Sequence, residues 1–193
     1  MNLHESSRRL GSLRAVELAC FRALGGRAPG LEPPSCARWA ASASRAHAWR
    51  ASILEELLPV SPGLPGLDEL TALPGGLLGE ELARCLPDRV ETGAAPAPGA
   101  GGLGRPPDDG RRLLGDLCGG LYPHLMAEYV RHLEKCTLAA DGAVVRTIGR
   151  AVADLETIRA EGTALRASLS TVAVPGQGSC TGKLDSTVTL TFE

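Results

Sequence analysis

Four long segments of the chain carry apolar residues three or four positions apart, the spacing that places them on one face of an α-helix. They span residues 7–24, 35–58, 111–136 and 141–169. A helix with one apolar face is stable in water only when that face is buried against another element. The pattern therefore predicts an all-α fold in which four long helices bury their apolar faces against one another.

Residues that start, stop or bend helices stand at the expected points of these segments. Gly25 follows the first segment, and Ser35 and Asp141 are the expected N-caps of the second and the fourth. Pro123 lies inside the third segment, where it should kink the helix. The loop between the third and fourth segments is short, so we expect these two helices to pack antiparallel.

The connection between the second and third helices, residues 59–110, is too long for a tight loop. Its residues 77–86 favour a short helix, whereas residues 91–107 are rich in Gly, Ala and Pro and are predicted to be disordered. A C-terminal tail, residues 170–193, ends in a Thr-rich alternation that is typical of a β-strand. We therefore predict one helical domain over residues 1–169, followed by a short irregular or β-like tail.

The composition argues against several classes of protein. A formal net charge of −2 offers no positive field for nucleic acid or an anionic membrane, so neither is expected as a partner. There is no long apolar run and no apolar leader near the N-terminus, which predicts a cytoplasmic protein. Six scattered cysteines without a C-x-x-C motif are expected to be buried, reduced thiols. The excess of Arg over Lys is typical of a GC-rich genome, such as an actinobacterial one.

Each predicted helix also carries polar side chains on or beside its apolar face, when residues are placed 100° apart. In chain order these are Glu17, then His47 and Arg50, then Glu128 and His132, then Glu156 and Arg159. For one such residue alone, a side chain that reaches solvent from the core edge is the simpler interpretation. A buried charge without a partner is costly, so polar residues on all four helices favour one buried polar cluster.

This arrangement resembles the ferritin-like family of four-helix bundles. The resemblance lies in one Glu on the first and third helices, a pair spaced i, i+3 on the second and fourth, and the long connection between the second and third. It covers about residues 7–169, without the Gly/Ala/Pro-rich insert. In the family the pairs are Glu-x-x-His, and the six residues hold two iron or manganese ions. The resemblance implies a four-helix bundle with a long crossover between helices two and three.

The chain departs from the family pattern at the residues that would bind metal. Glu17 and Glu128 match the lone glutamates, but the pairs read His47-Ala-Trp-Arg50 and Glu156-Thr-Ile-Arg159. Arginine stays protonated and offers only hydrogen-bond donors, so it cannot ligate a cation. We therefore expect no metal cofactor and a non-enzymatic protein with a buried charge network in place of the di-metal site. Its partner would be an unidentified protein or small molecule, with a homodimer as one option.

Two metal-binding alternatives remain open at this stage. A variant di-iron or di-manganese oxidase or hydroxylase could use the oxygen atoms and imidazoles of Glu17, His47, Glu128, His132 and Glu156. A second option is a one-helix metal face, because His124, Glu128 and His132 are spaced four apart.

Glu17 and Arg50 each lie near mid-helix, so antiparallel packing of the first two helices should bring them together.

Overall fold

The computed structural model describes residues 2–86 and 109–171 of the chain. Helices make up 84% of these residues and there is no strand among them, which confirms the all-α prediction for this part. The Gly/Ala/Pro-rich segment 91–107 and the strand predicted near residues 187–192 lie outside the described residues. Within the described residues, no helix is both long enough and apolar enough to cross a membrane.

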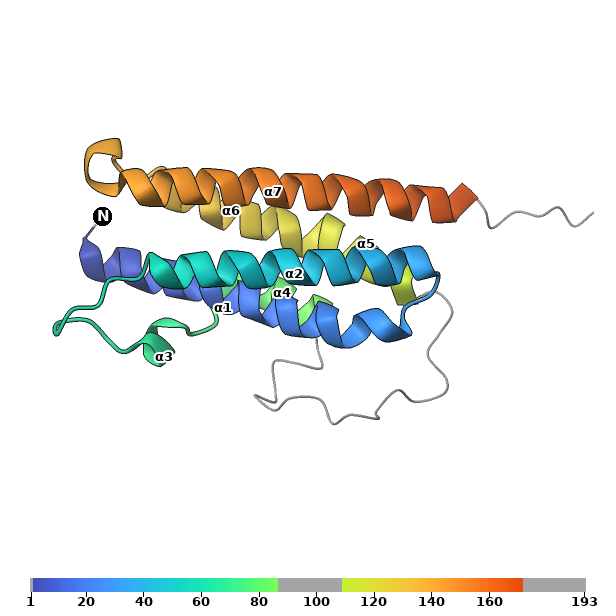
Figure 1. Ribbon diagram of the computed structural model, residues 1–193, viewed down its shortest axis with the longest axis horizontal. Helices are drawn as coiled ribbons and strands as arrows, with labels where there is room; N and C mark the ends of the chain where they lie inside the picture. Colours follow the sequence, from blue (N-terminus) through green and yellow to red (C-terminus); the bar gives the residue numbers. More distant parts are fainter. Residues whose placement is uncertain (1, 87–108, 172–193) are drawn as a thin grey trace, which may run out of the picture.

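The long helices lie side by side along the longest axis of the molecule (Figure 1). They are α1 (Leu3–Arg27), α2 (Pro34–Glu56), a composite helix and α7 (Leu138–Thr171). The composite helix consists of α5 (Asp109–Asp116), the π-helix η3 (Leu117–Leu121) and α6 (Tyr122–Leu133). The one-turn helix η1 (Ala28–Gly30) joins α1 to α2. Figure 1 shows that α1 and α2 run antiparallel, and that α6 and α7 do so as well.

Two short helices lie between α2 and α5. They are α3 (Leu67–Leu70) and α4 (Gly76–Cys85), of which the sequence had indicated the second. The chain around α3 packs closely on α1, because a Cβ atom at Gly11 would overlap the carbonyl group of Leu70. Gly11 therefore permits a backbone approach that any other residue would block.

The core is mainly aliphatic, with Leu residues contributed by α1, α2, α4, the composite helix and α7. Trp39, Tyr122 and Tyr129 are the aromatic residues buried within it. Trp39 also links two helices, since its indole Nε1–H donates to the carbonyl of Ile158 at 3.3 Å. Of the cysteines, Cys20, Cys36, Cys85 and Cys118 are buried thiols and Cys136 is partly exposed, with no disulfide bond among these five.

The composite helix changes its winding immediately before Pro123. Residues 117–121 form a π turn, and Leu117, Cys118 and Leu121 within it are buried. Proline has no N–H and its ring collides with the preceding turn, so the irregularity predicted from Pro123 takes the form of a wider turn. The turn is packed against α4, because a Cβ atom at Gly120 would overlap the guanidinium of Arg84.

The start of α7 contains a break at Asp141, whose φ of −119° and ψ of 22° are not helical. The Asp141 carboxylate accepts a hydrogen bond from the backbone N–H of Thr137 at 2.9 Å. A short helical turn, residues 138–140, therefore precedes the regular part of the helix that we predicted to open at Asp141.

Candidate functional site

An ion pair between Glu17 of α1 and Arg50 of α2 lies in the middle of the core. The Arg50 Nε donates to Glu17 Oε1 at 3.0 Å, and the two residues are 0% and 2% exposed. Because α1 and α2 are antiparallel, mid-helix positions on their facing sides meet, as the sequence predicted. The other side chains of the site hydrogen-bond to the Glu17 carboxylate or to a residue that does.

Three further side chains complete what we call the Glu17 network: Glu17, His47, Arg50, Tyr122 and Tyr129. His47 Nδ1 lies 2.5 Å from Glu17 Oε2, and its Nε2 lies 3.0 Å from the Tyr122 hydroxyl. The Tyr129 hydroxyl donates to Glu17 Oε1 at 2.7 Å. The network therefore joins α1 and α2 to the composite helix.

One assignment of protons satisfies the contacts of Glu17 and of both tyrosines. It does not satisfy the contact of Arg50 Nη2 with His47 Nδ1 at 2.9 Å, where both nitrogens then carry hydrogen. A neutral His47 with its proton on Nδ1 donates to Glu17 and accepts from the Tyr122 hydroxyl at Nε2. Glu17 then accepts from His47, Arg50 and Tyr129, and the Tyr hydroxyls each donate one hydrogen bond. The site holds one carboxylate and one guanidinium, so its net charge is zero.

The pKa directions agree with this assignment. Burial by itself raises the pKa of Glu17, but His47 and Arg50 outweigh it and hold the pKa below its usual range. Burial lowers the pKa of His47, which keeps the imidazole neutral near pH 7 despite the neighbouring Glu17. The pKa of Arg50 is raised because the attraction of Glu17 exceeds the effect of burial.

The Glu17 network is closed to solvent, since its five side chains are at most 2% exposed. Arg50 Nη1 has no hydrogen-bond partner among the described residues, and Nη2 has none there either when the proton of His47 is on Nδ1. Arg50 also borders a cavity of about 10 Å³ between α2 and α7, which Ile148 and Ala151 line as well. A space of that size holds about one water molecule and no substrate.

Four of the predicted cluster residues do not join the network. Glu128 is partly exposed and pairs with Arg131 of its own helix at 2.7 Å. His132 is 1% exposed but lines a separate pocket. Glu156 and Arg159 lie on the exposed side of α7, and the Arg159 guanidinium reaches the Cys118 carbonyl at 2.9 Å instead.

The physical reason is that α7 buries only a narrow face. Ile148, Ala151, Leu155 and Gly162 are its buried residues, so positions one or more places to the side of that line reach water. The long aliphatic part of an arginine side chain lets its charged end leave the core edge. The helical period predicted the direction of the buried face of α7, but not how many positions around the helix that face covers.

The metal alternatives would require ligands that the structure separates. Glu17 and His47 are in the network, Glu128 and His132 line the other pocket, and Glu156 is exposed. Over residues 2–86 and 109–171, no three His, Cys, Asp or Glu side chains form a group that could hold a metal ion. The one-helix face of His124, Glu128 and His132 is not such a group either.

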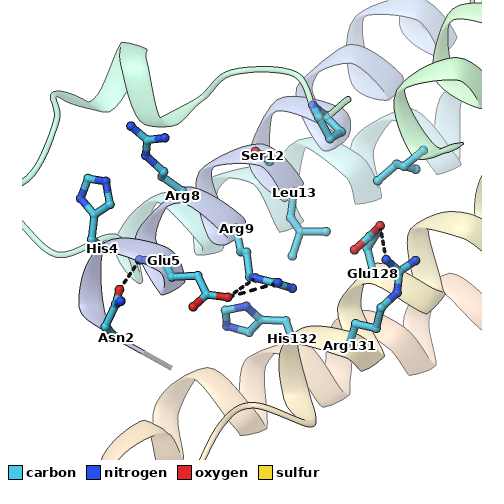
Figure 2. Close-up of a pocket in the computed structure, with 12 residues that line it drawn as sticks. Asn2, His4, Glu5, Arg8, Arg9, Ser12, Leu13, Glu128, Arg131 and His132 are labelled. Atoms are coloured by element: carbon cyan, nitrogen blue, oxygen red, sulfur yellow. Dashed lines mark hydrogen bonds and ion pairs between the residues drawn. The ribbon is translucent and has the colours of Figure 1, made fainter. Parts of the chain in front are cut away.

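The second site is a pocket of about 510 Å³ at one end of the molecule, between α1 and α6. We call it the α1–α6 pocket. Figure 2 shows the imidazole of His132 extending from α6 toward the Glu5–Arg9 pair of α1. Burial, the largest cause, and the charge of Arg9 both lower the pKa of His132. Neither ring nitrogen has a hydrogen-bond partner among the described residues.

Neither Tyr122 nor Tyr129 was predicted to belong to the site. A signal was present, because a Tyr hydroxyl on a buried helix face requires a polar partner.

A comparison of the chain with models of protein families, with curated proteins and with solved structures finds no match.

Proposed function

We propose that this chain is a ferritin-like four-helix bundle in which a buried ion-pair network takes the place of a metal centre. We further propose that it is not an enzyme and acts by binding a small molecule or another protein. The observation that carries the proposal is the full use of the Glu17 carboxylate by Arg50, His47 and Tyr129.

The arrangement of the helices supports the bundle. The chain runs along one antiparallel pair, α1 and α2, and along a second, α6 and α7 (Figure 1). The helices α3 and α4 follow α2 in the chain, and α2 ends at one end of the molecule whereas α5 begins near the other (Figure 1). A long connection at this point is the crossover that distinguishes the ferritin-like order of helices from a simple up-and-down bundle.

The chemistry of Arg50 supports a metal-free centre. A guanidinium is a permanent cation, so it balances the charge of Glu17 in the way a bound metal would. It also occupies the carboxylate oxygen with an N–H donor and repels any cation that approaches. A metal ion would have to displace hydrogen bonds from Glu17 and leave the Arg50 charge without its partner, which is costly in a buried site.

Metal analysis of the full-length protein, purified from cells grown with added iron and manganese, tests the proposal. We expect no stoichiometric metal. Stoichiometric iron or manganese that is retained in Glu128→Gln but lost in Glu17→Gln would overturn it. Glu128 is a matched control because it is a glutamate outside the network, paired with Arg131.

A further inference from the structure

The α1–α6 pocket contains a buried polar group that the fold itself does not satisfy. His132 is 1% exposed, and both Nδ1 and Nε2 lack a hydrogen-bond partner among the described residues. Buried polar atoms in native proteins are nearly always hydrogen-bonded, and an exception of this kind is often a functional group. His132 lies in the wall of a pocket of about 510 Å³, within the range of small-molecule sites.

The charged residues of the pocket favour an anionic ligand. Arg9 and Arg131 pair with Glu5 at 3.2 Å and with Glu128 at 2.7 Å, respectively. Arg8 is a third arginine in the lining, with no ion-pair partner among the described residues. Three arginines against two glutamates leave the lining with one excess positive charge when its histidines are neutral.

Part of the pocket is apolar. Leu13 of α1 and Leu78 of α4 line it together with Pro74, and both leucines are nearly fully buried. The polar end, at His132, and these apolar residues lie in the same pocket. A ligand that fills it must therefore combine a charged or polar group with an apolar body.

We propose that the α1–α6 pocket binds a small carboxylate whose apolar body lies along Leu13 and Leu78, with the carboxylate hydrogen-bonded to His132. This inference rests on the proposed binding role and names the class of ligand. A neutral imidazole donates one hydrogen bond, and a carboxylate can only accept, so the two groups are complementary. The arginines of α1 and α6 balance the ligand charge.

Isothermal titration of the full-length protein tests the proposal with two probes of equal length, octanoate and its neutral amide, octanamide. We expect octanoate to bind at one site and octanamide to bind about tenfold more weakly, since a charged acceptor strengthens the hydrogen bond. No binding of octanoate at millimolar concentration, or equal binding of the two probes, would overturn the proposal.

The variant His132→Leu separates a ligand-binding role from a purely structural one. Leucine removes both unpartnered nitrogens, so we expect the variant to be more stable than the wild type and yet to lose octanoate binding about tenfold or more. His124→Leu, on the same helix but outside the pocket, should bind as the wild type does. Unchanged octanoate binding in His132→Leu contradicts the proposal, and His132→Phe, which also lacks a hydrogen-bond donor, provides the same comparison if the leucine variant does not fold.

The outcomes for the two proposals are separable. A protein that carries stoichiometric metal and binds octanoate at His132 would refute the metal-free core and leave the ligand class intact. A metal-free protein that does not bind octanoate would leave the metal-free core intact and refute the ligand class. The Glu17 network and the α1–α6 pocket share no residue, so a variant in one does not remove a group from the other.

Discussion

Tyr129 and Glu17 are 112 positions apart in the chain and meet in the core, where the Tyr129 hydroxyl donates to Glu17 Oε1 at 2.7 Å. The same oxygen accepts from Arg50, so one carboxylate atom holds α1, α2 and α6 together. With Arg50 as its only partner, Glu17 would form an ion pair that links only the neighbouring helices α1 and α2. The tyrosines extend that pair into a network that fixes the position of the composite helix relative to the first two.

The Glu17–Arg50 pair should show strong coupling in a double-mutant cycle. Glu17→Leu leaves the Arg50 cation buried without its partner, which we expect to lower the free energy of unfolding by about 3–5 kcal/mol. The double variant Glu17→Leu with Arg50→Met replaces both charges with apolar groups and should be markedly less destabilised than the single one. Denaturant melts of the wild type, both single variants and the double variant give the coupling energy.

A matched control exists on the same two helices. Arg14 of α1 and Glu55 of α2 form an ion pair at 2.6 Å, but the Glu55 side chain is 47% exposed. Because water screens it, this pair should couple by no more than about 1 kcal/mol. Equal coupling in the two cycles, or simple additivity at Glu17 and Arg50, would contradict a buried ionic core.

The tyrosines should differ in what their hydroxyls contribute. Tyr129→Phe removes a hydrogen bond to a carboxylate, worth about 1.5–3 kcal/mol, and Tyr122→Phe removes one to a neutral imidazole, worth about 1 kcal/mol. We therefore expect Tyr129→Phe to lower the urea midpoint more than Tyr122→Phe. In the background of Glu17→Leu with Arg50→Met, the effect of Tyr129→Phe should shrink, because its acceptor is gone.

The protein should lose stability in mild acid. Burial lowers the pKa of both His47 and His132, so the folded chain keeps them neutral where the unfolded chain takes up protons. Stability from the neutral forms is complete above the unfolded value of about pH 6.5 and is lost as the pH falls through the folded pKa values. The lowered pKa of Glu17 adds a further loss below about pH 4.5.

Urea melts between pH 5 and pH 8 measure how steeply the free energy of unfolding changes with pH. This slope is about 1.4 kcal/mol per pH unit for each proton taken up on unfolding. His132→Leu should make the slope shallower. At His132 the neighbouring charges oppose one another, with Arg9 and Lys135 lowering the pKa and Asp141 and Glu5 raising it. A slope equal to that of the wild type would show that His132 does not titrate on unfolding.

Two glycines of α7 should respond in opposite directions to alanine. A Cβ atom at Gly162 would lie 2.5 Å from Cys118 Sγ and 2.8 Å from the Trp39 ring, so Gly162→Ala should destabilise the protein by about 1–3 kcal/mol. At Gly149 such a Cβ would have no atom within 4 Å apart from its chain neighbours and the nearby backbone of its own helix. Gly149→Ala should therefore raise the thermal midpoint, since alanine favours the helix by up to about 1 kcal/mol.

The sequence was sufficient to predict the four long helices and the centre of the network. Glu17 and Arg50 could be paired in advance because each stands on an apolar face near the middle of a helix, and a short turn makes those helices antiparallel. His47 followed from its spacing of three residues before Arg50, which places both on one side of α2.

The remaining members could not be assigned from spacing alone. Helical period gives the direction of a side chain, but not how far the neighbouring helices extend over it. Glu156 and Arg159 reach water because little of α7 is covered, whereas His132 is covered by the N-terminal part of α1 and lines a separate pocket. Tyr122 was missed because it lies beside the apolar face rather than within it when residues are placed 100° apart.

One face of the composite helix stays buried on both sides of the π turn at residues 117–121. Leu114 and Cys118 lie on it before the end of the turn, and Leu125, Tyr129 and His132 lie on it afterwards. The turn adds about one residue to the winding, and both Leu121 and Tyr122 are buried at its end. The face that brings Tyr129 to Glu17 therefore carries His132 to the α1–α6 pocket about one helical turn further on, so a single continuous face of α6 serves both sites.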